Sequence, residues 1–188
     1  MTPAYSGEGP VSGGQLQTLR EDILYGSFRA TMKTSSVEGV CQSLFFYKND
    51  NQEIDIELLT GAPNETGGTE SLHFTNQPDI TIAPEAGFDP AADYHDYRID
   101  WIPGKSQMWV DGVLRATLTQ EVPNLAGEVL LNSWSNGDPT WSQGPPTEDA
   151  LLRVSSTTMY FNHTNEAENT AFSTRCAKAT GTNKVCKV

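Results

Sequence analysis

The sequence has few basic residues and no long apolar run. Its 188 residues include 12 Lys and Arg against 24 Asp and Glu, which gives a formal net charge of −12. Phosphate backbones and anionic lipid surfaces repel such a chain, so nucleic acid and membrane surfaces are excluded as partners. No stretch of about 18 apolar residues occurs, so no membrane span is expected. The start of the chain also lacks the basic and apolar regions of a signal peptide.

Cysteine is also scarce, and its three copies are an odd number. Cys176 and Cys186 lie ten positions apart in a polar tail and are predicted to form a disulfide, with three reduced thiols as the alternative. Cys41 is left over in an apolar, strand-like stretch. Two Asn-x-Thr sequons, at Asn64 and Asn162, also favour a secreted protein.

The chain is nevertheless predicted to fold. Charged residues make up only 19% of it, while 4 Trp, 6 Tyr and 7 Phe can supply a core. Disordered chains instead combine high charge with low hydrophobicity. The length matches the roughly 100–200 residues of a single domain.

Helical periodicity is almost absent, and short alternating runs between turn signals predict an all-β sandwich or barrel. In one such run Phe28, Ala30 and Met32 share a face. Asp111-Gly112 is a hairpin signal. Polar loops, which often carry binding groups, are expected at 61–70 and 135–149. Further strands are expected at 97–101, 107–110, 113–115, 128–134 and 154–161.

The run from Gln52 to Leu58 is the most informative part of the sequence. A period of two places Glu53, Asp55 and Glu57 on one face and three apolar side chains on the other. Retaining glycosidases need two carboxyl groups about 5–5.5 Å apart, one as nucleophile and one as acid/base. The Cα atoms of Glu53 and Glu57 would lie about 13 Å apart in a straight strand. A curved, concave face would bring their side chains closer, and Asp55 between them would modulate both ionisations.

Two other interpretations of this acidic face remain open. The acids could be gatekeepers on a solvated edge strand, although three stacked like charges repel one another. They could also bind a metal ion, since hard cations prefer oxygen ligands. A straight strand spreads the three carboxylates too far apart to chelate one ion, so the catalytic pair is favoured and no metal or other cofactor is expected.

Glu53-Ile54-Asp55-Ile56-Glu57 resembles the active-site signature of glycoside hydrolase family 16, which contains β-glucanases and related transglycosylases. The similarity runs from about residue 12 to residue 160, and the stretch with Cys41 and Asn49-Asp50-Asn51-Gln52 resembles the fungal branch. Segments that support it in the same order are 25–28, 45–47, 97–101 with 109–112, and 131–134.

The resemblance implies a concanavalin A-like jelly-roll sandwich of two curved antiparallel sheets with an open cleft. It also implies a retaining mechanism with Glu53 as nucleophile, Glu57 as general acid/base and Asp55 hydrogen-bonded within the pair. The catalytic domain is expected over 1–162, without the opening strand of the family, and a C-terminal extension over 163–188. The expected protein is a monomeric endo-β-glucanase or transglycosylase, secreted or in the cell wall, acting on a polysaccharide.

Six further residues are expected to contact the sugar: Asn132, Trp134, His73, Asn51, Arg29 and Trp141. Parity places Asn132 and Trp134 on one face, where an indole can stack on a sugar ring and an amide can bind hydroxyls. His73 has the place of a cleft histidine in laminarinase-like members, with an exposed strand histidine as the alternative. Trp141 either extends a subsite or caps the sandwich.

Several positions depart from the family pattern. Asn51 replaces a frequent Trp, and Arg29 and Thr31 stand where Glu and Arg are common, which suggests a different linkage or acceptor. Ser155 replaces an Asp linked to calcium. The alternative function is a carbohydrate-binding jelly roll with little or no catalysis, and a second is an acidic structural wall protein. The three aligned acids argue against the first, and Asn132 with Trp134 argues against the second.

Overall fold

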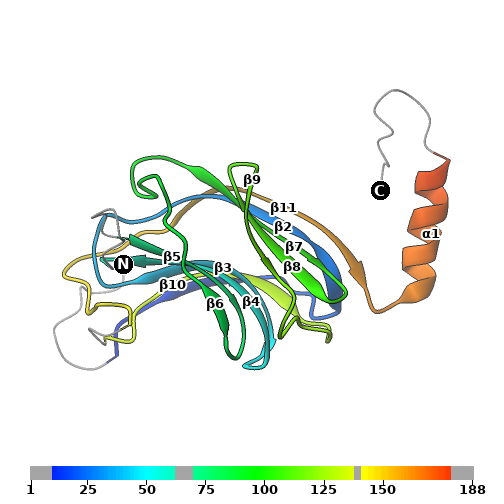
Figure 1. Cartoon of the computed structure of the whole chain (residues 1–188), viewed down its shortest axis with the longest axis horizontal. Coiled ribbons are helices and arrows are strands. Elements are labelled where there is room, and N and C mark those ends of the chain that lie inside the picture. The colour runs from blue at the N-terminus through cyan, green and yellow to red at the C-terminus, as the bar shows by residue number, and fades with distance from the viewer. Residues whose placement is uncertain (1–9, 62–69, 138–140, 179–188) are drawn as a thin grey trace.

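In the part of the chain that the structure describes, two antiparallel sheets form a sandwich with one helix beside it (Figure 1). The computed structural model describes residues 10–61, 70–137 and 141–178. Sheet A contains, in spatial order, β1 (Gly14–Gln17), β10 (Glu128–Trp134), β3 (Cys41–Asn49), β4 (Gln52–Thr60), β5 (Glu70–Asn76) and β6 (Ile80–Ile82). Sheet B contains β11 (Arg153–His163), β2 (Ile23–Lys33), β7 (His95–Ile102), β8 (Lys105–Val110) and β9 (Val113–Leu118).

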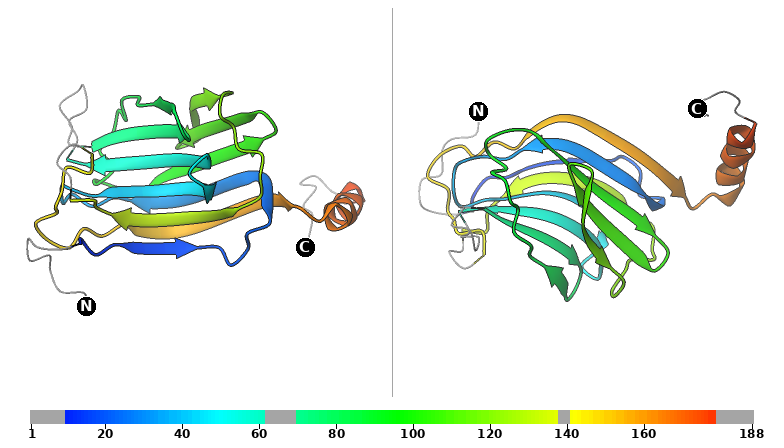
Figure 2. Two further views of the ribbon diagram at one scale, coloured as in Figure 1. Left: turned by 90° about the horizontal axis from the view of Figure 1, so that it is seen from below. Right: turned by 45° about the horizontal axis from the view of Figure 1, so that its top comes forward.

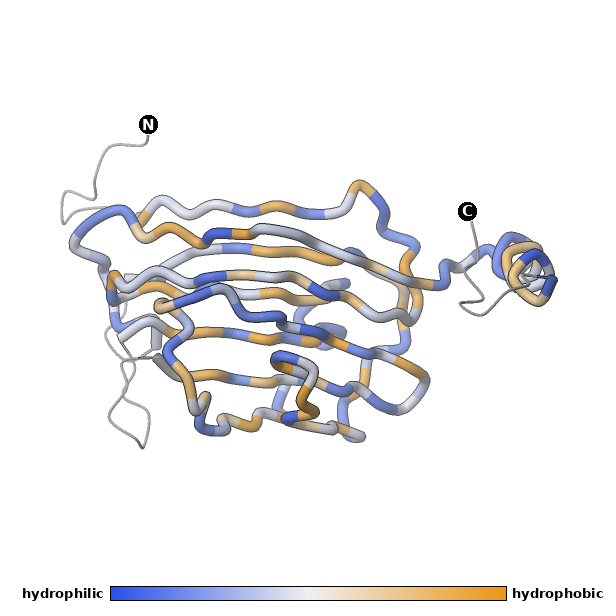
Figure 3. Tube along the Cα trace, turned by 90° about the horizontal axis from the view of Figure 1, so that it is seen from above, coloured by the Kyte–Doolittle hydropathy of each residue, from blue (hydrophilic) through white to orange (hydrophobic). Residues whose placement is uncertain are grey.

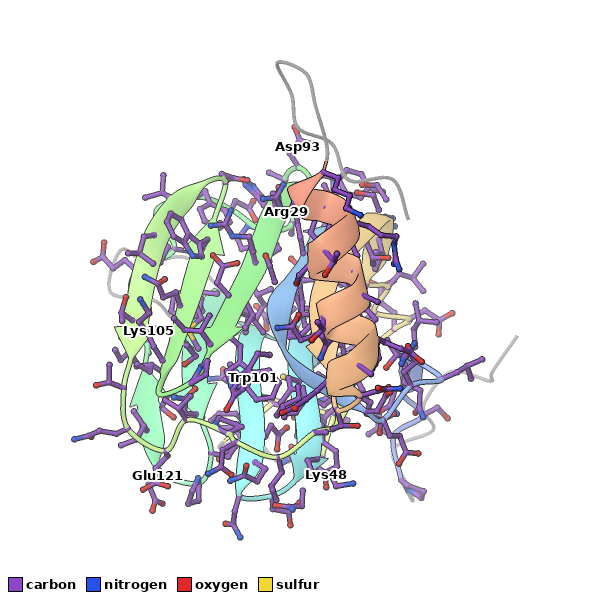
Figure 4. All side chains as sticks on the ribbon, turned by 90° about the vertical axis from the view of Figure 1, so that its right-hand side faces the viewer. Arg29, Lys48, Asp93, Trp101, Lys105 and Glu121 are labelled. Carbon is purple, nitrogen blue, oxygen red and sulfur yellow. The ribbon has the colours of Figure 1, made fainter. Side chains whose placement is uncertain are left out.

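The core lies between the two sheets, and alternation along the strands builds it. Apolar and polar residues alternate along much of the chain (Figure 3), so each strand turns one row of side chains toward the other sheet. Trp101 of β7 is fully buried there, and its indole nitrogen donates to the Pro123 carbonyl at 3.0 Å (Figure 4). The Phe46 ring of β3 lies 4.2 Å from the Trp101 ring, so this contact joins the two sheets.

The two-sheet jelly-roll architecture confirms the predicted all-β fold, and the expected strands lie within β2, β4 and β7 to β11. The predicted hairpin is present as well, because Asp111 and Gly112 link β8 to β9 with positive φ values of 50° and 75°. Loop 135–149 is described except for residues 138–140, whereas most of loop 61–70 lies outside the described residues.

The helix α1 (Glu166–Ala177) corrects the expectation that the chain has almost no helical signal. Its N-terminus is capped by Asn165, whose side chain accepts from the backbone of Ala167 and Glu168, so local capping stabilises it without a core-facing stripe. No residue of α1 is buried, and the helix stands apart from the sandwich in both views of Figure 2.

Two sequence features of the C-terminal part can be located in part. Cys176 is disulfide-bonded and Cys41 is a free, buried thiol, while Cys186 lies outside the described residues. Asn162 is exposed at the end of β11, and Asn64 lies outside the described residues. In the part of the chain that the structure describes, no helix is long and apolar enough to span a membrane.

Candidate active site

The face of sheet A that points away from the core carries the three acids. Ile54, Ile56 and Leu58 of β4 are fully buried against the core, so the alternation of the strand turns Glu53, Asp55 and Glu57 to the opposite face. This predicted grouping on one face is therefore present in the structure. Its neighbours come from β3 and β5, which flank β4 in the sequence, and from the remote strand β10.

Strand register sets the surroundings of each acid. One row across sheet A runs through directly opposed residues of five strands: Gln15, Asn132, Ser43, Glu57 and His73. The next row contains Leu130, Phe45, Asp55, Thr75 and Thr81. Residues directly opposed in antiparallel strands share a face. The acids thus share one face of sheet A with polar and apolar residues of all six strands, from β1 to β6.

Asp55 is the most enclosed of the three acids, with 3% of its surface exposed. It hydrogen-bonds to Glu53 and accepts from Gln77 Nε2 at 3.2 Å. Burial raises the pKa of Asp55 well above its usual range, and the neighbouring Glu53 and Glu57 add to this rise. A protonated Asp55 can therefore donate to Glu53. This arrangement favours a negative charge on Glu53 while Asp55 stays neutral.

Glu53 lies at the start of β4 and is only partly buried. Its burial raises its pKa to about 7, and the hydrogen bond with Asp55 opposes this rise. Glu57 contributes to the rise through the repulsion of like charges. The charge of Glu57 therefore influences the ionisation of Glu53, as is typical of a nucleophile and acid/base pair.

Glu57 lies in a less polar niche. Its Oε1 atom is 3.4 Å from the Sγ atom of Cys41, and Cys41 packs with Leu59, Trp134 and Trp141. Burial raises the pKa of Glu57. A raised pKa keeps a carboxyl group protonated at higher pH, as a general acid needs.

Four of the six predicted sugar contacts are grouped around Glu57. His73 is directly opposite it on β5, and the His73 ring lies 5.4 Å from the Trp141 ring in an edge-on arrangement. Asn132 accepts a hydrogen bond from the Ser43 hydroxyl in the same row. Trp134 is the register partner of Cys41 and packs with it. Asn51 is separate from this group, in the exposed turn between β3 and β4.

The prediction that Arg29 contacts the sugar is wrong. Arg29 lies on β2 of sheet B, between Phe28 and Ala30, which are both fully buried in the core. The alternation of the strand turns Arg29 to the outer face of sheet B, where its Nε is 3.4 Å from Asp96 Oδ1. The whole sandwich therefore separates Arg29 from the three acids.

Three residues beside the acids were not predicted from the sequence as site residues: Cys41, Ser43 and Gln77. Cys41, Ser43, Phe45 and Tyr47 occupy every second position of β3, so the period of two already placed them on one face. Parity alone does not reveal that β3 lies beside β4 with Ser43 opposite Glu57. Gln77 follows the end of β5, where its backbone N–H donates to the Glu53 carbonyl at 3.1 Å.

Two recesses adjoin edge strand β1, and neither is centred on the acids. The smaller, of about 260 Å³, is lined by Gly13, Gly14, Gln15, Asn132 and Trp134. The larger, of about 550 Å³, extends between β1 and residues 146–154 and shares Asn132 and Trp134 in its lining. The acid-bearing face therefore continues from Glu57 through Asn132 into a hollow beside an indole, which suits an extended ligand more than a small one.

The buried acids should make stability depend on pH. The folded-state pKa of Asp55 is raised, so its stabilising contribution is present below its unfolded pKa and is lost as pH rises through the folded value. We expect Asp55→Asn to melt about 2–4 °C higher than the wild type at pH 7, roughly 1 kcal/mol for a domain of this size. The difference should vanish near pH 4. Thermal unfolding between pH 4 and 8 tests this, with the exposed Glu21→Gln as a control that should show no such trend.

Comparison with known proteins finds one family whose model covers both the sandwich and the β4 signature. The model of the family described as "Glycosyl hydrolases family 16" matches residues 8–161. The chain belongs to glycoside hydrolase family 16. This family match spans both sheets, including the β4 signature and the β10 strand with Asn132 and Trp134.

This family 16 chain is similar in sequence to proteins named beta-glucanases and to a Crh-like protein. It is 33% identical over 145 residues to a beta-glucanase of Fibrobacter succinogenes, covering 69% of this chain and 40% of that protein. It is 31% identical over 128 residues to a beta-glucanase of Paenibacillus polymyxa, covering 62% and 51%. Over 139 residues it is 31% identical to Crh-like protein 2 of Botryotinia fuckeliana, covering 67% and 30%. The chain spans about half the length, or less, of these curated relatives.

Solved structures share the fold of this family 16 chain. The Bacillus licheniformis beta-glucanase superimposes with a TM-score of 0.65 at 24% identity, covering 79% of this chain and 71% of that one. A Crh5 transglycosylase without ligand gives 0.58 at 20% identity, covering 79% and 72%. These TM-scores show that the jelly-roll architecture is shared.

Proposed function

We propose that the protein is a retaining glycosidase or transglycosylase acting on a β-glucan-type polysaccharide. The observation that carries this proposal is the arrangement of the acids on β4. Asp55 is buried and hydrogen-bonded to Glu53, while Glu57 lies in the niche of Cys41, Leu59 and Trp134. Relatives named beta-glucanases and a Crh-like protein support the substrate class.

In the first step, the Glu53 carboxylate attacks the anomeric carbon and the glycosidic C–O bond breaks. Glu57 donates its proton to the departing oxygen, and its raised pKa keeps that proton available. Asp55 keeps its own proton and donates a hydrogen bond to Glu53, which holds the nucleophile in place. The product of this step is a glycosyl ester on Glu53.

In the second step, Glu57 is a carboxylate and accepts a proton from water or from a sugar hydroxyl. The oxygen of that acceptor attacks the anomeric carbon, and the bond to Glu53 breaks with its electron pair, so both glutamates return to their starting states. Water gives hydrolysis and a sugar gives transfer. Trp134 would stack on a sugar ring beside Glu57, and Asn132 and His73 would bind its hydroxyls.

We also propose that the protein is a secreted, fungal-type enzyme of the cell wall that works as a monomer. The disulfide bond of Cys176 and the exposed sequon at Asn162 support an oxidising, glycosylating compartment. Similarity to a Crh-like protein of Botryotinia fuckeliana supports the fungal cell wall. All three acids come from one strand, so one copy supplies the whole acidic group.

Product analysis on a panel of polysaccharides tests the proposal. The protein is incubated with laminarin, lichenan and chitin or glucan oligosaccharides, and the products are measured by mass spectrometry. Shortened products would indicate hydrolysis, and lengthened products would indicate transfer. If the protein binds these glycans and releases nothing from any of them, the carbohydrate-binding alternative replaces the enzyme.

The position of Arg29 gives a second expectation. Because Arg29 lies on the outer face of sheet B, Arg29→Ala should leave kcat/KM on a responsive glucan within about twofold and change stability by no more than about 0.5 kcal/mol. Asn132→Ala, on the acid-bearing face, should instead raise KM about tenfold by removing one hydrogen-bonding group from the sugar. Steady-state kinetics of the two variants compare them. Equal losses in both would mean that the face carrying the acids is not the binding face.

A further inference from the structure

Cys41 occupies a position that the proposed mechanism does not use. It begins β3, is fully buried, and is directly opposite Leu59 of β4 and Trp134 of β10. Its Sγ atom lies 3.4 Å from Glu57 Oε1, and the Trp134 side chain packs against Cys41. The thiol thus connects the carboxyl group of Glu57 to the indole beside the recess at β1.

The other groups around Glu57 come from its own strand, from β5 and from β10. Asp55 and Glu53 lie on the same face of β4, His73 faces Glu57 from β5, and Asn132 and Trp134 of β10 are neutral. Burial raises the pKa of Glu57, and the hydrogen bond from Cys41 opposes that rise. Burial and the charge of Glu57 also raise the pKa of the thiol itself, so it keeps its proton and acts as a donor.

We propose that Cys41 is a positioning residue for Glu57: its S–H group donates to Oε1 and holds the acid/base carboxyl group in a fixed orientation relative to Trp134. This inference rests on the proposed function for the role of Glu57. The hydrogen bond itself is independent of that role.

The chemistry of a thiol suits a group that has to exchange a proton. An S–H group is a weak donor, and a buried cysteine packs as a small apolar side chain. A Lys or Arg in its place would hold Glu57 ionised and prevent it from protonating a leaving group. A purely apolar residue would leave the orientation of the carboxyl group unconstrained and its charged form less stable. A thiol permits both protonation states of Glu57 while still favouring one orientation of its carboxyl group.

Two variants separate donation from packing. Cys41→Ser keeps a donor, and Cys41→Val keeps an apolar group of similar size without one. If Glu57 is the acid, its pKa limits the alkaline side of the pH profile of kcat/KM. We expect Cys41→Val to move that limb upward by roughly 0.5–1 pH unit, because the ionised form loses a hydrogen bond. Cys41→Ser should stay near the wild type.

A spectroscopic measurement tests the contact without requiring activity or the valine variant. The infrared difference spectrum between the wild type and Cys41→Ser isolates the S–H stretching band of Cys41. We expect this band to move to lower frequency as pH rises and Glu57 ionises, and to be independent of pH in the Glu57→Gln background. A pH-independent band in the wild type would overturn the proposal, as would an unchanged alkaline limb in a folded Cys41→Val.

The failure of this proposal is distinguishable from that of the proposed function. If the wild type cleaves no glycan but its S–H band still follows Glu57, the hydrogen bond stands and the catalytic role of Glu57 is wrong. If the wild type is active and the band ignores Glu57, the enzyme stands and Cys41 serves only to pack the niche.

Discussion

Replacing Glu53 by glutamine is expected to lower the rate of glycan cleavage by at least about 10³-fold, the scale seen when a catalytic nucleophile is removed. An amide has nearly the same shape as the carboxylate, so the hydrogen bond with Asp55 and the packing on β4 should survive. Glutamine cannot supply the negatively charged oxygen that forms the glycosyl ester. The loss should therefore appear in kcat, with KM close to that of the wild type.

Asp50→Asn is the matched control for this variant. Asp50 is an exposed acid in the turn before β4, where it accepts from the Tyr47 hydroxyl at 3.0 Å. Removing its charge changes the net charge equally and takes away only the smallest contribution to the raised pKa of Glu53, so the rate well above pH 7 should stay within about twofold. Rates are measured on the glycan that responds best in the product analysis, with thermal unfolding as the check of folding. A Glu53→Gln variant that keeps more than a tenth of the wild-type rate would exclude Glu53 as the nucleophile.

Replacing Glu57 by alanine is expected to have an effect that depends on the leaving group. On an unactivated glucan the rate should fall by about 10²–10⁴-fold, because the departing oxygen no longer receives a proton. An aryl glycoside with an acidic phenol needs no such proton, so formation of the glycosyl ester should be nearly normal. The second step would then lack its base, and the ester on Glu53 should accumulate.

Pre-steady-state kinetics on the two substrate types distinguish this pattern from general damage. We expect a burst of phenol release from the aryl glycoside followed by slow turnover, and azide should speed that turnover because it needs no base to attack. His73→Ala serves as the control, because His73 lies directly opposite Glu57 on β5. It should raise KM and show neither a burst nor azide rescue. Equal losses by Glu57→Ala on both substrates, without a burst, would contradict the acid/base assignment.

Strand parity accounts for most of what the sequence predicts correctly. A period of two is intrinsic to an extended backbone, so the placement of Glu53, Asp55 and Glu57 on one face follows from the order of residues alone. The all-β class and most strands follow in the same way from alternation and turn signals, whereas the two curved sheets followed from the resemblance to the family. The hairpin at Asp111 and Gly112 depends only on local backbone preference, which favours glycine at positive φ.

Long-range pairing is what parity cannot supply. The neighbours of Glu57 come from β3, β5 and β10, and only the pairing of those strands places Ser43, His73 and Asn132 in one row with it. The wrong prediction for Arg29 has the same cause. The sequence placed Arg29 on the face of β2 opposite its apolar residues, but it did not show that β2 joins the sheet that lacks the acids. Gln77 was not predicted because its contact with Asp55 depends on how the chain leaves β5.

Covalent trapping tests the central claim most directly. The protein is treated with a β-glucan oligosaccharide that carries fluorine at C2 and an activated leaving group, so that the second step is slowed, and the labelled peptide is then sequenced by mass spectrometry. We expect one fluorinated oligosaccharide label per chain, attached to Glu53, and no label in Glu53→Gln. Attachment to another residue, or release of the leaving group by a folded protein that never carries a label, would contradict the account.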